Sequence, residues 1–273
     1  ALGVAFEHFS PDALVERQPA LAPIREFMAG AVYFPDDESG DAFKFTNELL
    51  RVSQRLGVKV KWNAPVKRLV IRKGRIAGVV LQNGDVLSAD RVVIAAGAHS
   101  PSIAAQAGVN LAIKPVKGYS VTYSGKRLQP EAMLRFPIID DALHAAVTPL
   151  GDRIRVAGTA EFTGFDRTLD KARIENLRGI LRAILPEQAD ALEVDEQLRW
   201  ANFRPMHAYG APWIGAAPVK GVYINAGHGH LGWTLAAGSG EALAQHMLDA
   251  NPAFNLTASL SKKAFAKIVW QAV

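Results

Sequence analysis

The sequence predicts a mixed α/β (α+β) protein with two domains. A strand-length apolar run, a glycine-rich turn and an amphipathic helix follow one another from Gly221 to Leu248. A second buried-looking strand, at residues 92–96, also ends in small residues. Residues 111–213 between them hold longer strand-like runs around one helix, as an antiparallel domain does. We therefore expect an α/β core assembled from segments on both sides of an antiparallel domain.

Size and composition exclude several classes of protein. With 273 residues, of which 49% are hydrophobic, the chain is long enough for a large core. It has no cysteine, which excludes disulfides, thiolate metal sites and a cysteine nucleophile and fits a reducing compartment. The net charge of +5 comes from scattered Lys and Arg, so nucleic-acid binding is not expected, whereas a membrane surface or an anionic substrate stays open. No apolar run approaches the roughly 18 residues of a membrane span, and we expect a cytoplasmic protein.

The first 40 residues predict a short helix and a loop. Ser10 or Asp12 can cap a helix that continues through Leu14. Phe34–Gly40 reads as a loop, because its acidic residues stand beside proline and glycine. The acidic cluster 36–38 invites a metal site, but no histidine spacing supports one, so no metal is expected.

The following residues predict a helix and then small strands. Asp41–Leu56 places most of its apolar residues on one side of a helix, which Gly57 ends. Val58–Trp62 alternates apolar and polar side chains, as a strand does. Val66–Ile71 and Ile76–Leu81 are joined by a glycine turn and predict a small antiparallel meander.

The expected antiparallel domain alternates strands with one helix. Its strand-like runs are 113–123, 144–148, 153–160 and 193–203. A helix from 170 to 185 has apolar residues at core spacing and ends before Pro186.

The glycines at 227, 229 and 232 mark the expected ligand site. A turn between a strand and a helix directs unpaired backbone N–H groups and the positive end of a helix dipole at one point. Glycines let a flat ligand approach the backbone closely. The site suits an electron-rich ligand edge, although the spacing alone fits equally well a turn that packs and binds nothing.

The stretch from Gly227 to Gly240, GHGHLGWTLAAGSG, resembles the C-terminal flavin-binding signature of the D-amino-acid dehydrogenase and glycine oxidase group of FAD-dependent oxidoreductases, the DAO family. The resemblance implies FAD as cofactor, with the turn and helix start against the pyrimidine end of the isoalloxazine. Negative charge gathers there on reduction, which a helix N-terminus stabilises. The implied flavin-binding residues are Gly227, His228, Gly229, Leu231, Gly232, Trp233 and Thr234.

A second signature, Asp90–Ser100, is similar to the family's "VIAAGAxS" strand, which runs beneath the dinucleotide. The resemblance gives that role to Ala96 and Gly97. Val66 stands where the family has a valine along the adenosine half of FAD. The two signatures occur in the family's order and spacing.

The resemblance also implies a domain organisation. An FAD/NAD(P)-binding-type domain would combine 41–110 and 214–250, and the antiparallel substrate domain would span 111–213. Residues 1–40 would be a connecting segment and 251–273 a tail. The family begins with a strand and a GxGxxG turn for the FAD pyrophosphate, which is not found at the start of this chain. We therefore expect a form that is incomplete at its N-terminus, without roughly the first third of the family's chain.

Trp200–Gly215 corresponds to the family's "GLRPxTPDGxPxxG", in which the arginine binds the substrate carboxylate. The resemblance assigns this role to Arg204; a guanidinium presents a planar fork that matches a carboxylate. The other reading is a surface arginine beside a proline turn. Tyr119, His144 and Tyr209 are further candidates on the substrate side, although no tyrosine stands in the His144 strand where oxidase relatives have one.

Three functional hypotheses follow from the resemblance. The first is FAD-dependent oxidative deamination of D-amino acids to 2-oxo acids and ammonia, with hydride transfer from Cα to flavin N5 and electrons passed to a quinone or another acceptor. This first hypothesis allows the protein to associate peripherally with the cytoplasmic face of the inner membrane. The second is oxidation of glycine, sarcosine, hydroxyproline or opine-type amines, with room for a partner subunit. The third is a remnant that binds no flavin.

Overall fold

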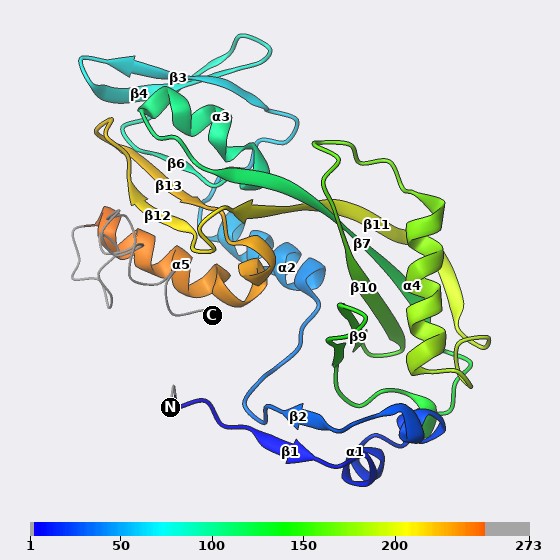
Figure 1. Ribbon diagram of the computed structural model, residues 1–273. Coiled ribbons are helices and arrows are strands. Elements are labelled where there is room, and N and C mark those ends of the chain that lie inside the picture. The colour runs from blue at the N-terminus through cyan, green and yellow to red at the C-terminus, as the bar shows by residue number, and fades with distance from the viewer. Residues whose placement is uncertain (1–2, 249–273) are drawn as a thin grey trace. The chain divides into compact units, whose positions relative to one another are not determined.

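The computed structural model describes residues 3–248 and divides the chain into two compact units (Figure 1). The first unit comprises Ala1–Val52, Lys117–Glu161 and Asp166–Asn202. The second unit comprises Ser53–Val116, Phe162–Phe165 and Phe203–Val273. The chain is a mixed α/β protein with antiparallel sheets, and this confirms the expected fold class.

The first unit is built on a five-stranded sheet. Its strands are β7 (Ile113–Ser124), β8 (Ile138–Asp140), β9 (Ala145–Pro149), β10 (Arg153–Glu161) and β11 (Glu193–His207), in the order β11-β7-β10-β9-β8. β10 pairs antiparallel with both β7 and β9. Every residue of β7 from Val116 to Tyr123 is buried, so this strand is covered on both faces and forms the centre of the unit.

Helix α4 (Lys171–Ile184) packs on this sheet, as its sequence predicts. Asp170 caps the helix by accepting hydrogen bonds from two backbone N–H groups of the first turn. Its buried residues Leu177, Leu181 and Ile184 are spaced by one helical turn and share a core with strands β7, β9 and β10.

The N-terminal elements complete the first unit. β1 (Glu7–Phe9) pairs antiparallel with β2 (Ala31–Tyr33), and α1 (Pro11–Arg17) and the 3₁₀ helix η1 (Pro19–Phe27) lie between them in the chain. Ser10 caps α1, as expected, by accepting from the N–H of Ala13. The fully buried Gln18 donates to the carbonyl of Phe136 and accepts from the N–H of Arg135, which fixes this segment to the sheet.

The second unit contains a three-stranded sheet in the order β12-β13-β6. β12 (Trp213–Ala216) is antiparallel to β13 (Val222–Ala226), and β13 is parallel to β6 (Val92–Ile94). The two strands that carry the glycine-ended signatures therefore lie side by side in one sheet, as expected. Helix α5 (Gly232–Met247) follows β13 after the 3₁₀ turn η5 (Gly229–Leu231). After β6 come the short helices η2 (Gly97–His99), α3 (Ser100–Ala104) and η3 (Ala105–Ala107).

The predicted meander is present in the second unit. β3 (Val66–Arg72), β4 (Arg75–Leu81) and β5 (Val86–Ser88) form an antiparallel sheet in that order. Leu69 and Ile76 are buried in a core shared with β6 and β13. The N–H of Leu69 donates to Gln106 Oε1 at 2.9 Å, which ties β3 to the helical segment after β6.

One expectation from periodicity was wrong, and another was confirmed. The strand expected at 58–62 is irregular backbone, and its Val58 and Trp62 are 55% and 71% exposed; alternation does not make a strand where no neighbour pairs with it. The helix expected from Asp41 is found as α2 (Ala42–Arg55), but none of its residues is buried, and Phe43 is 74% exposed. Local propensity and Asp41, which accepts from the N–H groups of Phe43 and Lys44, form this helix without burying its apolar side.

Candidate functional site

The candidate site lies in the second unit, at the edge where two parallel strands end. β6 and β13 run in the same direction, with Val92 opposite Val222. The turns that follow them, through Ala96 and through Gly227, therefore leave the sheet at the same edge (Figure 1). Open α/β sheets bind ligands at the carboxyl ends of their strands. The pairing thus brings together the two stretches that the sequence indicates for the cofactor.

The turn after β13 has no room for side chains at two positions. Gly227 has φ +88°, and a Cβ there would lie 3.1 Å from Ile113 Cδ1 and 3.3 Å from His207 Cβ. Gly229 has φ +57°, and a Cβ there would lie 3.1 Å from Met206 Sδ. The left-handed backbone favours glycine at both positions, and an added Cβ would be tightly packed at each.

Helix α5 begins at Gly232 without a side-chain cap from its N-cap residue. Among the described residues, Leu231 makes no side-chain hydrogen bond to the first turn. The positive end of the helix dipole lies here and favours an electron-rich group. A Cβ on Gly232 would meet only His228 Cβ, at 3.6 Å, so this glycine leaves open space in front of the helix.

The glycines 227, 229 and 232 also have the spacing G-x-G-x-x-G, after a parallel strand and before a helix. Sequence reasoning missed that this stretch has that spacing. In dinucleotide-binding proteins a turn of this kind holds a pyrophosphate. The turn can therefore bind either a phosphate or the electron-rich edge of a flat ring.

The turn after β6 is open in the same way. Gly97 has φ +54°, and a Cβ there would meet nothing within 4 Å. The N–H of Ala96 donates to the Oγ of the buried Ser100 at 3.1 Å, which fixes the backbone of the turn. The ring of His99 stacks on Phe165, with centroids 4.5 Å apart. The turn is thus held from behind, and its ligand-side surface stays free of side chains.

Four buried polar side-chain atoms near the glycine turn have no hydrogen-bond partner. Among the described residues, these atoms are His228 Nε2, His207 Nδ1, Trp213 Nε1 and Asn225 Oδ1. Burial lowers the pKa of His228 and of His207, so both imidazoles are neutral at pH 7. A buried polar atom without a partner costs about 1–3 kcal/mol. A polar ligand at this edge would relieve that cost.

Strand β11 places Arg204 beside the same turn. Met206 pairs with His228 through an isolated antiparallel bridge, and its Sδ lies against Gly229. Because alternate residues of a strand share a face, Arg204 leaves β11 on the side of Met206. Arg204 is half-buried, and burial lowers the pKa of its guanidinium, which nevertheless stays charged at neutral pH. The alternation of β11 thus puts Arg204 on the face from which Met206 meets the glycine turn.

The remaining candidates of the turn are at its surface. Leu231 and Trp233 are 48% and 46% exposed, and Thr234 is exposed as well. Tyr209 is exposed in the turn after β11, with its ring edge-on to His207. Val66 is the half-buried first residue of β3, in the meander rather than in the sheet that ends at the glycine turn.

Tyr119 and His144 belong to the first unit. Tyr119 is 1% exposed, and its Oη donates to Glu161 Oε2 at 2.7 Å. His144 is exposed in a turn before β9, with φ +48°. The expectation that it begins the strand was therefore wrong. The glycine turn, by contrast, belongs to the second unit.

Sequence reasoning missed a buried cation in the first unit. The Nζ of Lys117 is 3.3 Å from Asp166 Oδ2 and donates to the carbonyl of Thr168 at 2.6 Å. Its ammonium lies over the ring of Tyr119. The sequence offered a weak signal, a lysine inside the apolar strand of residues 113–123, where a charge needs a partner.

The described residues 3–248 contain no group of three or more His, Asp or Glu side chains placed to share a metal ion. Within the same residues, no helix is both long and apolar enough to cross a membrane.

Comparison with known proteins shows extended similarity. Residues 1–246 match the protein family described as DAO, FAD dependent oxidoreductase. The chain is 37% identical over 267 residues to a D-amino acid dehydrogenase of Xanthobacter autotrophicus, covering 98% of this chain and 62% of that protein. It is 39% identical over 244 residues to a D-amino acid dehydrogenase of Methylobacterium nodulans, covering 89% of this chain and 56% of that protein. The chain thus spans about three-fifths of the length of these relatives.

Solved structures share the fold. Glycine oxidase from Bacillus cereus aligns with a TM-score of 0.80 at 25% identity, over 92% of this chain and 68% of that one. Glycine oxidase from Geobacillus kaustophilus aligns with a TM-score of 0.84 at 24% identity, over 93% of this chain and 66% of that one.

Proposed function

Because this chain belongs to the DAO family of FAD-dependent oxidoreductases, we propose that its second unit binds the isoalloxazine of FAD in an enzyme that oxidises amino acids. One observation carries the proposal. The glycine turn and the uncapped start of α5 lie at the carboxyl edge of parallel strands, beside the unpaired Nε2 of His228. Backbone N–H groups, a helix dipole and an imidazole are the groups that would stabilise charge at the pyrimidine edge of a flavin.

The residues of the turn would hold the ring in distinct ways. Gly227 and Gly229 keep side chains out of the turn, and the open space before Gly232 admits the ring edge. The side chains of Leu231 and Trp233 provide apolar surface. Val66 would lie along the adenosine half, and Ala96 and Gly97 would lie beneath the dinucleotide, the roles that the resemblance gives them. When bound, FAD supplies the hydride acceptor of the reaction.

Arg204 would bind the carboxylate of the substrate. It leaves β11 on the face that meets the glycine turn, and its partly desolvated guanidinium favours a charge-assisted pair. Such a pair fixes the amino acid so that Cα–H is directed at the flavin, which converts the transfer into a positioned, nearly unimolecular step. The neutral histidines 207 and 228 add no competing cations beside Arg204.

D-amino acids are the favoured substrates, since the relatives reported above are D-amino acid dehydrogenases and align over most of this chain. The proposed products are a 2-oxo acid and ammonia, with a quinone or another acceptor taking the electrons. Peripheral membrane association and a partner subunit belong to the same proposal. Oxidation of glycine or secondary amines is the second candidate, because the fold aligns closely with glycine oxidase.

The test is flavin binding followed by a substrate panel. We would titrate the purified chain with FAD and with riboflavin 5′-phosphate, which lacks the adenosine half, and follow flavin fluorescence. Binding of both flavins supports the isoalloxazine site, whereas an unaltered spectrum with both would support a remnant without cofactor. Anaerobic bleaching of bound FAD by D-alanine, glycine, sarcosine and L-proline then ranks the substrate classes.

A control separates the ring site from the phosphate alternative. Free pyrophosphate should not displace riboflavin 5′-phosphate if the turn binds the ring edge. Displacement at equal concentrations would instead assign the turn to a phosphate.

A further inference from the structure

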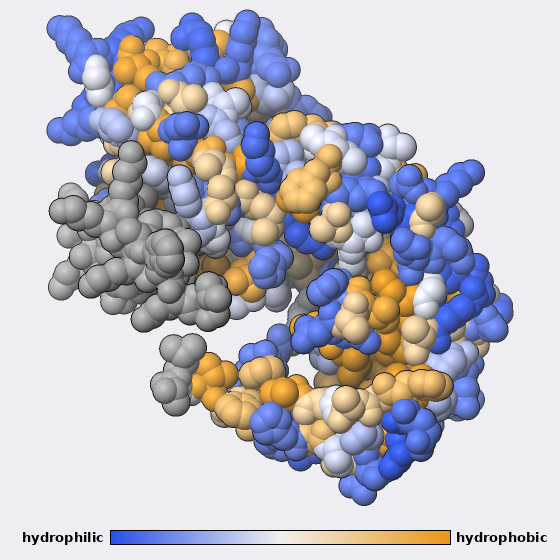
Figure 2. All heavy atoms as spheres, in the orientation of Figure 1, coloured by the Kyte–Doolittle hydropathy of each residue, from blue (hydrophilic) through white to orange (hydrophobic). Residues whose placement is uncertain are grey.

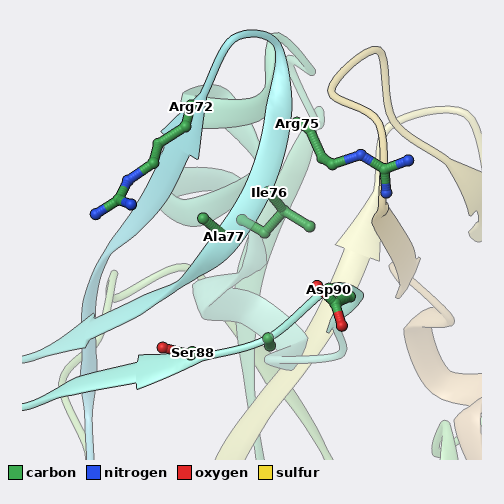
Figure 3. Close-up of a pocket in the computed structure, with 7 residues that line it drawn as sticks. Arg72, Arg75, Ile76, Ala77, Ser88 and Asp90 are labelled. Atoms are coloured by element: carbon green, nitrogen blue, oxygen red, sulfur yellow. The ribbon is translucent and has the colours of Figure 1, made fainter.

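A second cleft lies at the tip of the β3–β4 hairpin and has a volume of about 350 Å³ (Figure 3). It is bounded by Arg72, Arg75 and Asp90, and Ala77, Ser88 and Ala89 line it between them. Arg72 and Arg75 extend to opposite sides of the hairpin, and Asp90 lies on the side of Arg75 (Figure 3).

The cleft is separate from the glycine turn. The N–H of Ile76 donates to the carbonyl of Lys220 at 3.0 Å, and the N–H of Val92 donates to that of Gly221 at 2.8 Å. These contacts tie the hairpin to the points where β6 and β13 begin, whereas the glycine turn lies where they end. A five-residue strand such as β13 separates the two ends by roughly 15 Å.

Four cations gather at this end of the unit without carboxylate partners. A tight turn, in which Lys73 and Gly74 have φ +49° and +73°, places Arg72 directly opposite Arg75. Lys220 joins them, since its N–H donates to the carbonyl of Gly74. Among the described residues, none of these four side chains forms an ion pair or a hydrogen bond.

The rim of the cleft at the tip of the β3–β4 hairpin is strongly hydrophilic. Figure 2 shows hydrophilic side chains projecting where Figure 1 places the tip of β3 and β4, with hydrophobic residues between them. The apolar part includes Ile76, which is buried beneath the cleft, and the methyl groups of Ala77 and Ala89. The rim is therefore charged and the floor is apolar.

The charges and polar groups define the ligand. The cleft is lined by two arginines and the single carboxylate of Asp90, and Lys73 and Lys220 belong to the adjoining turns, so cations outnumber carboxylates at this end of the unit. This excess of positive charge favours a phosphate dianion over a carboxylate. An aspartate carboxylate such as that of Asp90 accepts hydrogen bonds, and the hydroxyl of Ser88 can donate or accept, so a bound molecule would also carry hydroxyl groups. We propose that this cleft binds a phosphate ester with hydroxyl groups, of which glycerol phosphate is the simplest, either free or as the headgroup of a lipid.

The first experiment titrates the purified chain with glycerol 3-phosphate by calorimetry at low salt. The double variant Arg72→Gln/Arg75→Gln should bind at least tenfold more weakly. The matched control Lys59→Gln/Lys67→Gln removes two exposed charges from the same unit outside the cleft and should stay within twofold of the parent. Ala89→Leu keeps every charge but fills the cleft, and it should also lose at least tenfold. Circular dichroism and urea midpoints confirm that each variant is folded.

Further experiments identify the source of the phosphate ester and test the role of Asp90. Sedimentation with phosphatidylglycerol vesicles, compared with phosphatidylcholine vesicles, reports a lipid headgroup, and calorimetry reports the free ester; binding in either arm that depends on Arg72 and Arg75 supports the proposal. Asp90→Asn should reduce the preference for glycerol 3-phosphate over inorganic phosphate. The proposal is overturned if neither probe binds, if both double variants lose affinity equally, or if Ala89→Leu binds as the parent does.

Discussion

Replacing Gly227 with alanine tests whether the turn is as constrained as its geometry indicates. At φ +88° an L side chain is strained, at a cost of about 1–2 kcal/mol. The new methyl group would also lie 3.1 Å from Ile113 Cδ1 and 3.3 Å from His207 Cβ, and overpacking of this kind costs about 1–3 kcal/mol. We expect Gly227→Ala to lower the free energy of unfolding by about 2–5 kcal/mol.

The assay is urea unfolding of the purified chain, followed by circular dichroism, with Gly238→Ala as the matched control. Gly238 is inside α5, and a Cβ there meets nothing within 4 Å, so the same substitution should raise stability by about 0.5–1 kcal/mol. The stability changes of the two variants are expected to have opposite signs, which separates strain at Gly227 from any general effect of replacing glycine with alanine. A loss below about 0.5 kcal/mol for Gly227→Ala, with the control behaving as expected, would refute the described turn.

Three further predictions follow. Arg204→Lys keeps the charge but loses the planar fork, so in an enzyme that oxidises D-alanine it should weaken substrate binding by about 1.5–3 kcal/mol without lowering flavin content; unchanged steady-state affinity would remove Arg204 from the carboxylate site. Asp170→Ala removes the cap of α4 and should cost about 0.5–2 kcal/mol in urea unfolding, whereas Asp170→Asn, which keeps an accepting oxygen, should cost less. Burial lowers the pKa of His207 and of His228 in the folded chain, so the unfolded chain binds these protons more tightly and stability should fall as the pH drops below about 6.5. His207→Gln/His228→Gln should flatten that part of the stability–pH curve, and an unchanged slope would show that these imidazoles are not buried as described.

Local chemistry made much of the fold predictable. Asp170 followed by apolar residues at helical spacing specifies α4 without reference to the rest of the chain, and the Lys73-Gly74 pair specifies the β3–β4 turn. The prediction of a strand at 58–62 was wrong, because a strand needs a neighbouring strand to pair with, and the alternation of side chains does not show whether one is present. α2 shows the same limit, because an amphipathic pattern says which side is apolar but not what covers it.

The glycine turn was predictable as a motif, but its surroundings were not. Glycine spacing and the family signature indicated residues 227–234 from the sequence alone. The contacts of Gly227 with Ile113 and of Gly229 with Met206 join residues far apart in the chain, so no local pattern could indicate them. The unpaired atoms of His207, Trp213 and Asn225 depend on the same long-range packing. The roles of Arg204, Tyr119, His144 and Tyr209 in catalysis stay predictions.

The parallel pairing of β6 with β13 has a consequence for how the chain folds. Val92 pairs with Val222, about 130 residues later, so the two halves of the cofactor edge meet only after nearly all of the described chain has been synthesised. Contacts of such long sequence separation slow folding, because loop closure must precede the gain from pairing. The five-stranded sheet on which α4 packs includes contacts between residues that are near in sequence, such as those between β9 and β10. On the ribosome, the β9–β10 hairpin and α4 can therefore form first, and the edge strand β6 waits longest for its partner, exposed to aggregation until β13 emerges.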